Sequence, residues 1–214
     1  MKKWRNLLKI EEKGIVAVVR KIDVEIVDDV VDALVEGGIQ ILEITVDSEN
    51  SYDTMHRLKK RYQDQVLVGA GTVLDTETAK RAIDANADFI FSPIFNQELI
   101  QLTNKYGRIS IPGVFTPTEI VQAYSYGADI LKVFPATNLG PKYFKDLQGP
   151  MGHIPLMPTG GVNLDNMADF IKSGAVAVGI GGALFEKENL DNRNFTKISE
   201  LAKSYHNKFL EAKS

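Results

Sequence analysis

The chain has 214 residues, of which 44% are hydrophobic and 25% are charged, which is the composition of an ordinary globular protein. The formal net charge of −3 and the pI near 5.7 argue against a nucleic-acid partner, because nucleic-acid binders usually carry a basic face. The chain contains no cysteine, which excludes disulfides, cysteine metal sites and a cysteine nucleophile. The apolar run 174–184 is too short and glycine-rich to cross a bilayer, and the N-terminal segment does not resemble a signal peptide. We therefore expect a cytoplasmic protein with no membrane partner.

Short apolar runs alternate with longer amphipathic segments along the chain. Each run is nearly continuous in hydrophobicity and is bounded by Gly, Pro, Ser or Asp, which is typical of strands covered on both faces. The runs predict eight strands, at 15–19, 39–46, 66–70, 89–91, 109–111, 130–134, 154–157 and 176–180.

Helix-like segments follow these strands, and an extra helix precedes the first one. The clearest patterns predict helices over 24–36, 75–86, 117–126, 165–173 and 195–212. The basic run Lys59-Lys60-Arg61 has no interleaved aromatic residues, so we interpret it as a solvated helix end.

Alternating strands and helices indicate an α/β fold with a parallel sheet and right-handed crossovers. Eight repeats leave about 25 residues per unit, close to the lower limit for a closed (β/α)8 TIM barrel. A doubly wound open sheet fits less well, because the chain has no linker and no Gly-x-Gly-x-x-Gly after the first strand. We predict a single (β/α)8-barrel domain over residues 1–214 with an extra N-terminal helix.

The active site of such a barrel lies at the C-terminal ends of its strands. Lys132 falls there, within the apolar stretch 130–135. Burial disfavours the charged amine and lowers its pKa, and a neutral amine can attack a ketone. A structural lysine whose head reaches the barrel mouth is the alternative.

Glu43 lies in a second apolar run, 41–46. Strand alternation puts Glu43 on the face opposite Leu42 and Ile44, and the covering helices require the apolar face, so Glu43 should point into the barrel. Lys132 points inward by the same argument. The two side chains form either a structural ion pair or a nucleophile with its proton shuttle.

Two glycine pairs follow the last two predicted strands, at Gly160-Gly161 and Gly181-Gly182. These loops commonly form the phosphate site of a barrel, where bare backbone N–H groups face the anion. Tight turns without a ligand are the alternative. The three histidines show no metal-ligand spacing, and no Ser-His-Asp arrangement or Walker loop is present.

Together these residues resemble the 2-keto-3-deoxy-6-phosphogluconate (KDPG) and 4-hydroxy-2-oxoglutarate (KHG) aldolase family. The resemblance extends in order over nearly the whole chain. It is carried by 14–20, 42–45, 68–73, 91–93, 111–114, 131–136, 158–162 and 179–184.

The resemblance implies a metal-independent class I aldolase that acts on a 2-keto acid and an aldehyde, requires no cofactor and forms a homotrimer. It makes Lys132 the Schiff-base lysine and Glu43 the proton shuttle. The implied substrate-binding residues are Thr72 for the pyruvyl carboxylate, Phe134 and Pro93 at the pocket wall, and Thr159, Gly160, Gly161, Gly181 and Gly182 at the distal, usually phosphorylated end.

Two positions depart from the family pattern. Many members carry an Arg four residues after the shuttle Glu, where this chain has Asp47. An acid cannot clamp a carboxylate, so we expect Arg20, after the first strand, to supply the positive charge. Ala183 stands where some members have a Ser near the phosphate.

Two rival functions remain. A sugar-phosphate epimerase or a thiamine-phosphate synthase would share the phosphate loops but needs metal-binding or pyrophosphate-handling acids at the strand ends, which the sequence lacks. A non-catalytic sensor would bind a sugar phosphate and keep a structural Lys–Glu pair. Fold alone does not separate these functions.

Overall fold

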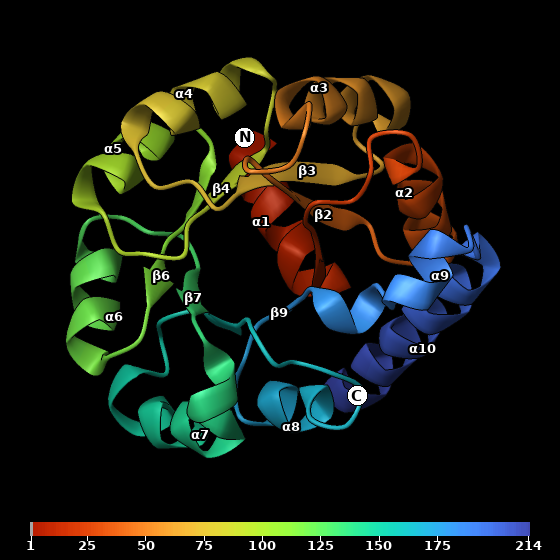
Figure 1. The fold of residues 1–214 in the computed structure, drawn as a ribbon. Helices are drawn as coiled ribbons and strands as arrows, with labels where there is room; N and C mark the ends of the chain where they lie inside the picture. The colour runs from red at the N-terminus through yellow and green to blue at the C-terminus, as the bar shows by residue number, and fades with distance from the viewer. Residues whose placement is uncertain (1) are drawn as a thin grey trace.

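The computed structural model describes residues 2–214 and consists of a curled parallel β-sheet surrounded by helices (Figure 1). The strands are β1 (Ile15–Val19), β2 (Ile41–Thr45), β3 (Leu67–Gly71), β4 (Phe89–Phe91), β5 (Ile109–Ile111), β6 (Gly113–Val114), β7 (Leu131–Val133), β8 (Leu156–Pro158) and β9 (Val178–Ile180). The α-helices are α1 (Lys2–Lys13), α2 (Val27–Glu36), α3 (Ser51–Tyr62), α4 (Thr76–Asp84), α5 (Gln97–Lys105), α6 (Pro117–Ser125), α7 (Gly140–Met151), α8 (Met167–Lys172), α9 (Lys187–Asp191) and α10 (Phe195–Lys213).

The strands form two parallel sheets that adjoin at both edges. One sheet has the order β5-β4-β3-β2-β1-β9 and the other β6-β7-β8. Isolated bridges join Leu156 to Ala175 and Thr159 to Gly179, between β8 and the β9 region. At the opposite edge only Pro112 separates β5 from β6, and proline lacks the N–H that would continue the ladder. The sheet therefore curls round in the manner of a TIM barrel.

Each predicted strand has a counterpart in the structure, and the strand alternation is confirmed. Leu42 and Ile44 of β2 pack in the apolar layer between sheet and helices, whereas Ile41 belongs to the cluster inside the sheet. In β7, Leu131 and Val133 face the helices. Glu43 and Lys132 therefore lie on the inner face, where the sequence predicted them.

Helix α1 lies across the N-terminal ends of the strands, behind the centre of the ring in Figure 1. Its Ile10 is fully buried in the inner cluster. Lys3 Nζ lies 2.8 Å from Asp129 Oδ2, just before β7, and Lys9 Nζ donates to the Gln65 carbonyl, just before β3. With this end covered, the interior is accessible from the C-terminal ends of the strands.

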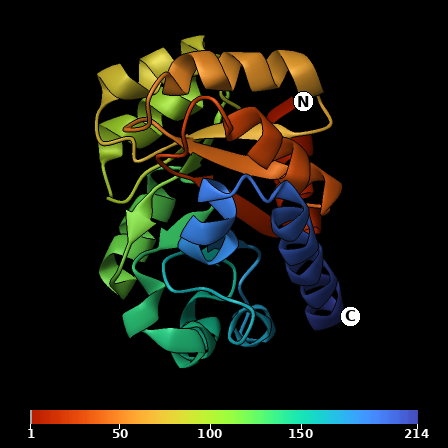
Figure 2. The same cartoon turned by 45° about the vertical axis from the view of Figure 1, so that its right-hand side comes forward.

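The outer helices form a continuous layer, and the last of them, α10, packs beside α2 and α8 (Figure 2). Helix α6 shows how the sequence defines a helix start: Thr116 and Glu119 form a capping box, and Pro117 occupies the first turn. Within residues 2–214, no helix is both long and apolar enough to cross a membrane.

The interpretation of Lys59-Lys60-Arg61 as a solvated helix end was wrong for Lys59. This residue lies on the inner side of α3 and is only 5% exposed. Its Nζ donates to Asp88 Oδ2 at 2.6 Å and to the carbonyls of Gln63 and Val66. Burial of this charge is tolerated because the ammonium is paired and hydrogen-bonded.

Candidate active site

A cavity of about 820 Å³ opens at the C-terminal ends of the strands. All of the predicted site residues line it: Arg20, Glu43, Thr72, Pro93, Lys132, Phe134, Thr159, Gly160, Gly161, Gly181 and Gly182. They come from or directly follow seven strands: β1, β2, β3, β4, β7, β8 and β9. The fold thus brings together residues that are far apart in the sequence.

Lys132 projects from the middle of β7 and is 5% exposed. Its Nζ lies 4.3 Å from the centroid of the Phe91 ring and 4.6 Å from that of Phe134. Burial lowers the pKa of the Lys132 amine, and the positive charge of Arg20 lowers it further, while Glu43 opposes the shift. The amine is therefore shifted towards the neutral, nucleophilic form.

Glu43 projects from the middle of β2 and is 1% exposed. Its Oε2 has no hydrogen-bond partner among residues 2–214. Burial raises the pKa of Glu43 to about 7, although the charges of Lys132 and Arg20 act in the opposite direction. A carboxyl group with a pKa near neutrality can both accept and return a proton.

The two inward side chains do not form a close ion pair. Within the described chain, no salt bridge of 4.0 Å or less joins Glu43 to Lys132. The contrast with Lys59 and Asp88, a buried pair at 2.6 Å, shows what a structural ion pair looks like in this same fold. The geometry favours the catalytic interpretation, because each group remains free for a ligand between them.

The glycine loops supply bare backbone amides at the distal end of the cavity. Among the described residues, the amides of Gly161, Gly182 and Ala183 have no hydrogen-bond acceptor. Gly160 and Gly161 have φ of 86° and 77°, and a Cβ on Gly161 would lie 2.1 Å from Thr137 Oγ1. Glycine is thus required there for the backbone to take this shape. The loops form a cradle suited to an anion.

Arg20 lies at the cavity mouth, and its side chain is 56% exposed. Its Nη2 donates to Asp47 Oδ2 at 3.0 Å. The neighbouring cation and hydrogen bonds keep the pKa of Asp47 below its usual value despite partial burial. Arg20 is therefore a cation at the predicted position, but one that already has an acidic partner.

Several lining residues escaped the sequence analysis. They are apolar side chains that follow the strands, namely Ile22, Leu74, Val162 and Phe185 in loops and Leu190 in α9. Composition cannot distinguish such residues from ordinary core. The one usable signal was position, because Phe185 follows the second glycine pair by only three residues. Residues 2–214 contain no cluster of three or more His, Cys, Asp or Glu side chains suited to a metal ion.

A buried lysine with a lowered pKa and a buried carboxyl group with a pKa raised to about 7, both inside a TIM-barrel-like sheet, suit the Schiff-base chemistry of a class I aldolase. Comparison with known proteins agrees with this class. The sequence model of the KDPG and KHG aldolase family matches residues 7–201. The chain belongs to this family.

Relatives and solved structures give the same assignment. The chain is 32% identical to the 2-dehydro-3-deoxy-phosphogluconate aldolase of Haemophilus influenzae, with 91% of this chain and 92% of the relative covered. It is 30% identical to the 2-dehydro-3-deoxy-6-phosphogalactonate aldolase of Escherichia coli, covering 82% and 86%. A crystal structure of the KDPG aldolase of Legionella pneumophila, with pyruvate captured as a covalent carbinolamine, matches with a TM-score of 0.83 and 28% identity, over 90% of this chain and 93% of that one.

Proposed function

We propose that this protein is a class I aldolase that cleaves KDPG to pyruvate and glyceraldehyde 3-phosphate, KHG to pyruvate and glyoxylate, or both. The observation that carries the proposal is the buried Lys132 amine, inside a cavity that also holds Glu43, with its pKa lowered and no salt bridge within residues 2–214. Family membership and the named aldolase relatives support the same reaction.

In the proposed reaction the neutral Lys132 amine attacks the C2 ketone, and loss of water gives a protonated imine. The Glu43 carboxylate takes the proton of the C4 hydroxyl, directly or through a water, and the C3–C4 bond breaks to release the aldehyde. The C3–C4 electron pair moves into the imine to give an enamine. Protonation at C3 and hydrolysis then release pyruvate and restore the amine. This route needs no metal and no cofactor.

The remaining site residues bind the two ends of the substrate. Thr72 and Arg20 hold the pyruvyl carboxylate, while Phe134 and Pro93 form the wall beside the reacting carbons. Thr159 and the amides of the two glycine loops hold the distal end, which would be a phosphate in KDPG. Three of these amides and the Oγ1 of Thr159 have no hydrogen-bond partner in the part of the chain that the structure describes, which supports this assignment.

We further propose, on the family resemblance, that residues 1–214 form one closed (β/α)8 barrel with α1 as the extra N-terminal helix. On the same resemblance we expect a homotrimer in the cytoplasm. The bridges between β8 and β9 support closure of the sheet. Sedimentation equilibrium measures the trimer directly.

The substrate assignment is tested by measuring pyruvate release from KDPG, from its galactonate epimer and from KHG. The galactonate epimer is included because one relative is named for it. We expect release from KDPG or KHG by the native protein and none after Lys132→Ala. Lys142→Ala, which changes an exposed lysine of α7, is the matched control and should retain activity. A protein that binds these compounds without releasing pyruvate would be the sensor instead.

A further inference from the structure

Asp47 forms the principal contact of Arg20 at the cavity mouth. Besides the 3.0 Å hydrogen bond from Arg20, Asp47 Oδ2 lies 3.4 Å from Lys21 Nζ. Arg20 and Lys21 follow β1, and Asp47 follows β2, so this carboxylate links two neighbouring loops.

A second contact joins the same two loops through Ser48. Its Oγ accepts a hydrogen bond from the Lys21 amide at 2.8 Å and lies 2.9 Å from Oγ1 of the buried Thr45. Lys21 adopts a positive φ of 51°, a shape that a non-glycine residue keeps only when its surroundings hold it. The backbone that carries Arg20 is therefore fixed, and the arginine side chain is left to be fixed by Asp47.

The guanidinium retains most of its donors. Arginine has five N–H groups, and Asp47 receives one hydrogen bond from Nη2. The other N–H groups of Arg20 have no partner among residues 2–214. An exposed arginine without a partner would sample many rotamers, and the loss of that rotamer freedom on binding opposes binding. Asp47 removes part of that cost before the substrate arrives.

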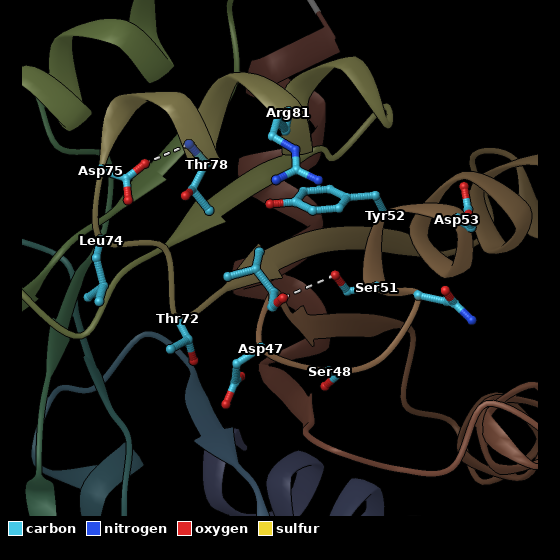
Figure 3. A pocket seen from close by; sticks show the side chains of 12 residues that line it. Asp47, Ser48, Ser51, Tyr52, Asp53, Thr72, Leu74, Asp75, Thr78 and Arg81 are labelled. Atoms are coloured by element: carbon cyan, nitrogen blue, oxygen red, sulfur yellow. Dashed lines mark hydrogen bonds between the residues drawn. The ribbon is translucent and has the colours of Figure 1, made fainter.

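Asp47 lines a second, polar groove of about 740 Å³ (Figure 3). The groove shares Thr72 and Leu74 with the cavity. Of its acids, Asp75 accepts from the Thr78 amide within the groove, whereas Asp47 is held by Arg20 and Lys21, which do not line the groove. Asp47 itself borders this groove, but its partner Arg20 lines the cavity, so we interpret Asp47 as acting on the cavity through Arg20.

We propose that Asp47 is a positioning residue, which holds the Arg20 guanidinium so that its remaining donors meet the carboxylate of the 2-keto acid. The inference rests on the proposed function. It gives a role to the acid that stands where many family members carry a carboxylate-clamping Arg.

Positioning and simple electrostatics predict opposite effects at Asp47. Removing an acid makes the mouth more positive, so electrostatics alone would strengthen binding of the anionic keto acid. Loss of positioning weakens binding instead. The pH profile reports a further effect, because the Asp47 charge raises and the Arg20 charge lowers the pKa of Glu43.

The test measures kcat and KM for the cleaved keto acid in Asp47→Ala, Asp47→Asn, Arg20→Gln and the Asp47→Ala/Arg20→Gln double variant, at about pH 8.5, where Glu43 is ionised. We expect Asp47→Ala to raise KM roughly tenfold with kcat nearly unchanged, a loss equivalent to about 1.4 kcal/mol. Asp47→Asn keeps one acceptor oxygen and should lose less. In the Arg20→Gln background, Asp47→Ala should have no further effect on KM. The rising limb of kcat against pH should move to lower pH in Asp47→Ala and to higher pH in Arg20→Gln.

Asp53→Asn is the control, because Asp53 lines the same groove and, among the described residues, forms no salt bridge. It should change neither KM nor the pH profile. A lower KM in Asp47→Ala would overturn the proposal. So would a rise in KM on Asp47→Ala that is equally large in the native and in the Arg20→Gln background. Absence of pyruvate release by the unmodified protein would instead overturn the proposed function, so the two failures are distinguishable.

Discussion

Gly71 leaves the space that the Glu43 carboxyl group occupies. A Cβ at position 71 would lie 1.8 Å from Glu43 Oε1 and 2.4 Å from its Cδ. Gly71 ends β3 and pairs in register with Thr45 of β2, so the two residues are fixed on adjacent strands. The absence of a side chain on one strand thus determines where the acid on the next one points.

Gly71→Ala should therefore displace Glu43 without affecting Lys132. We expect kcat to fall roughly 10²-fold, which is the typical cost of misplacing a catalytic group by about 1 Å. Pyruvate should still be trapped on Lys132. Steady-state kinetics and borohydride trapping measure the two effects. Gly149→Ala, where nothing lies within 4 Å of the added Cβ, is the control and should retain kcat.

The raised pKa of Glu43 gives the reaction a defined pH dependence. Because the base must be ionised, kcat should rise with pH through about 7. Glu43→Gln should lower kcat by roughly 10²–10⁴-fold and should abolish this rise of kcat with pH. The profile is measured from about pH 5 to 9 with a pyruvate-release assay. If kcat of Glu43→Gln still rises with pH through about 7, the titrating group is a different residue.

The same group links folding to pH. Folded Glu43 keeps its proton up to about pH 7, whereas the unfolded chain loses it near the ordinary value of 4.5. Its contribution to stability is therefore full below pH 4.5 and is lost as pH rises through 7, because the folded state binds more protons in that window. Between pH 4.5 and pH 7 the free energy of unfolding of the native protein should fall by roughly 3 kcal/mol relative to that of Glu43→Gln. Urea denaturation at a series of pH values measures this difference, and parallel curves for the two proteins would contradict it.

Gly182→Ala tests the distal anion cradle. No atom lies within 4 Å of a Cβ added at Gly182, so the fold should tolerate the change. The methyl group should still obstruct a phosphate that approaches the backbone. We expect KM for KDPG to rise about tenfold or more, and KM for unphosphorylated KHG to change little. An equal change in KM for both substrates would show that the loop does not bind the phosphate group.

Strand alternation and strand-end position predicted much of the site. The inward direction of Lys132 and Glu43 followed from their apolar neighbours, and the glycine pairs marked the two loops with unpartnered amides. The prediction of direction succeeded because a parallel strand covered on both faces leaves little freedom in where a charged side chain can point.

The features missed by the sequence analysis depend on packing between distant segments. Lys59 is buried because α3 turns it towards Asp88, and a basic run does not reveal which of its members faces inward. Phe185 and Leu190 line the cavity although their residue types are ordinary core types. The contact between Arg20 and Asp47 joins two loops whose shapes no local pattern specified.

The most direct measurement is borohydride reduction of the protein in the presence of pyruvate, followed by intact-mass analysis and peptide mapping. The account predicts one pyruvate-derived adduct per chain, located on Lys132 and absent from Lys132→Ala. It also predicts that the adduct forms in Glu43→Gln, whose amine is intact. No adduct with pyruvate in excess, or an adduct confined to other lysines, would contradict the Schiff-base mechanism and favour a sugar-phosphate-binding protein without aldolase activity.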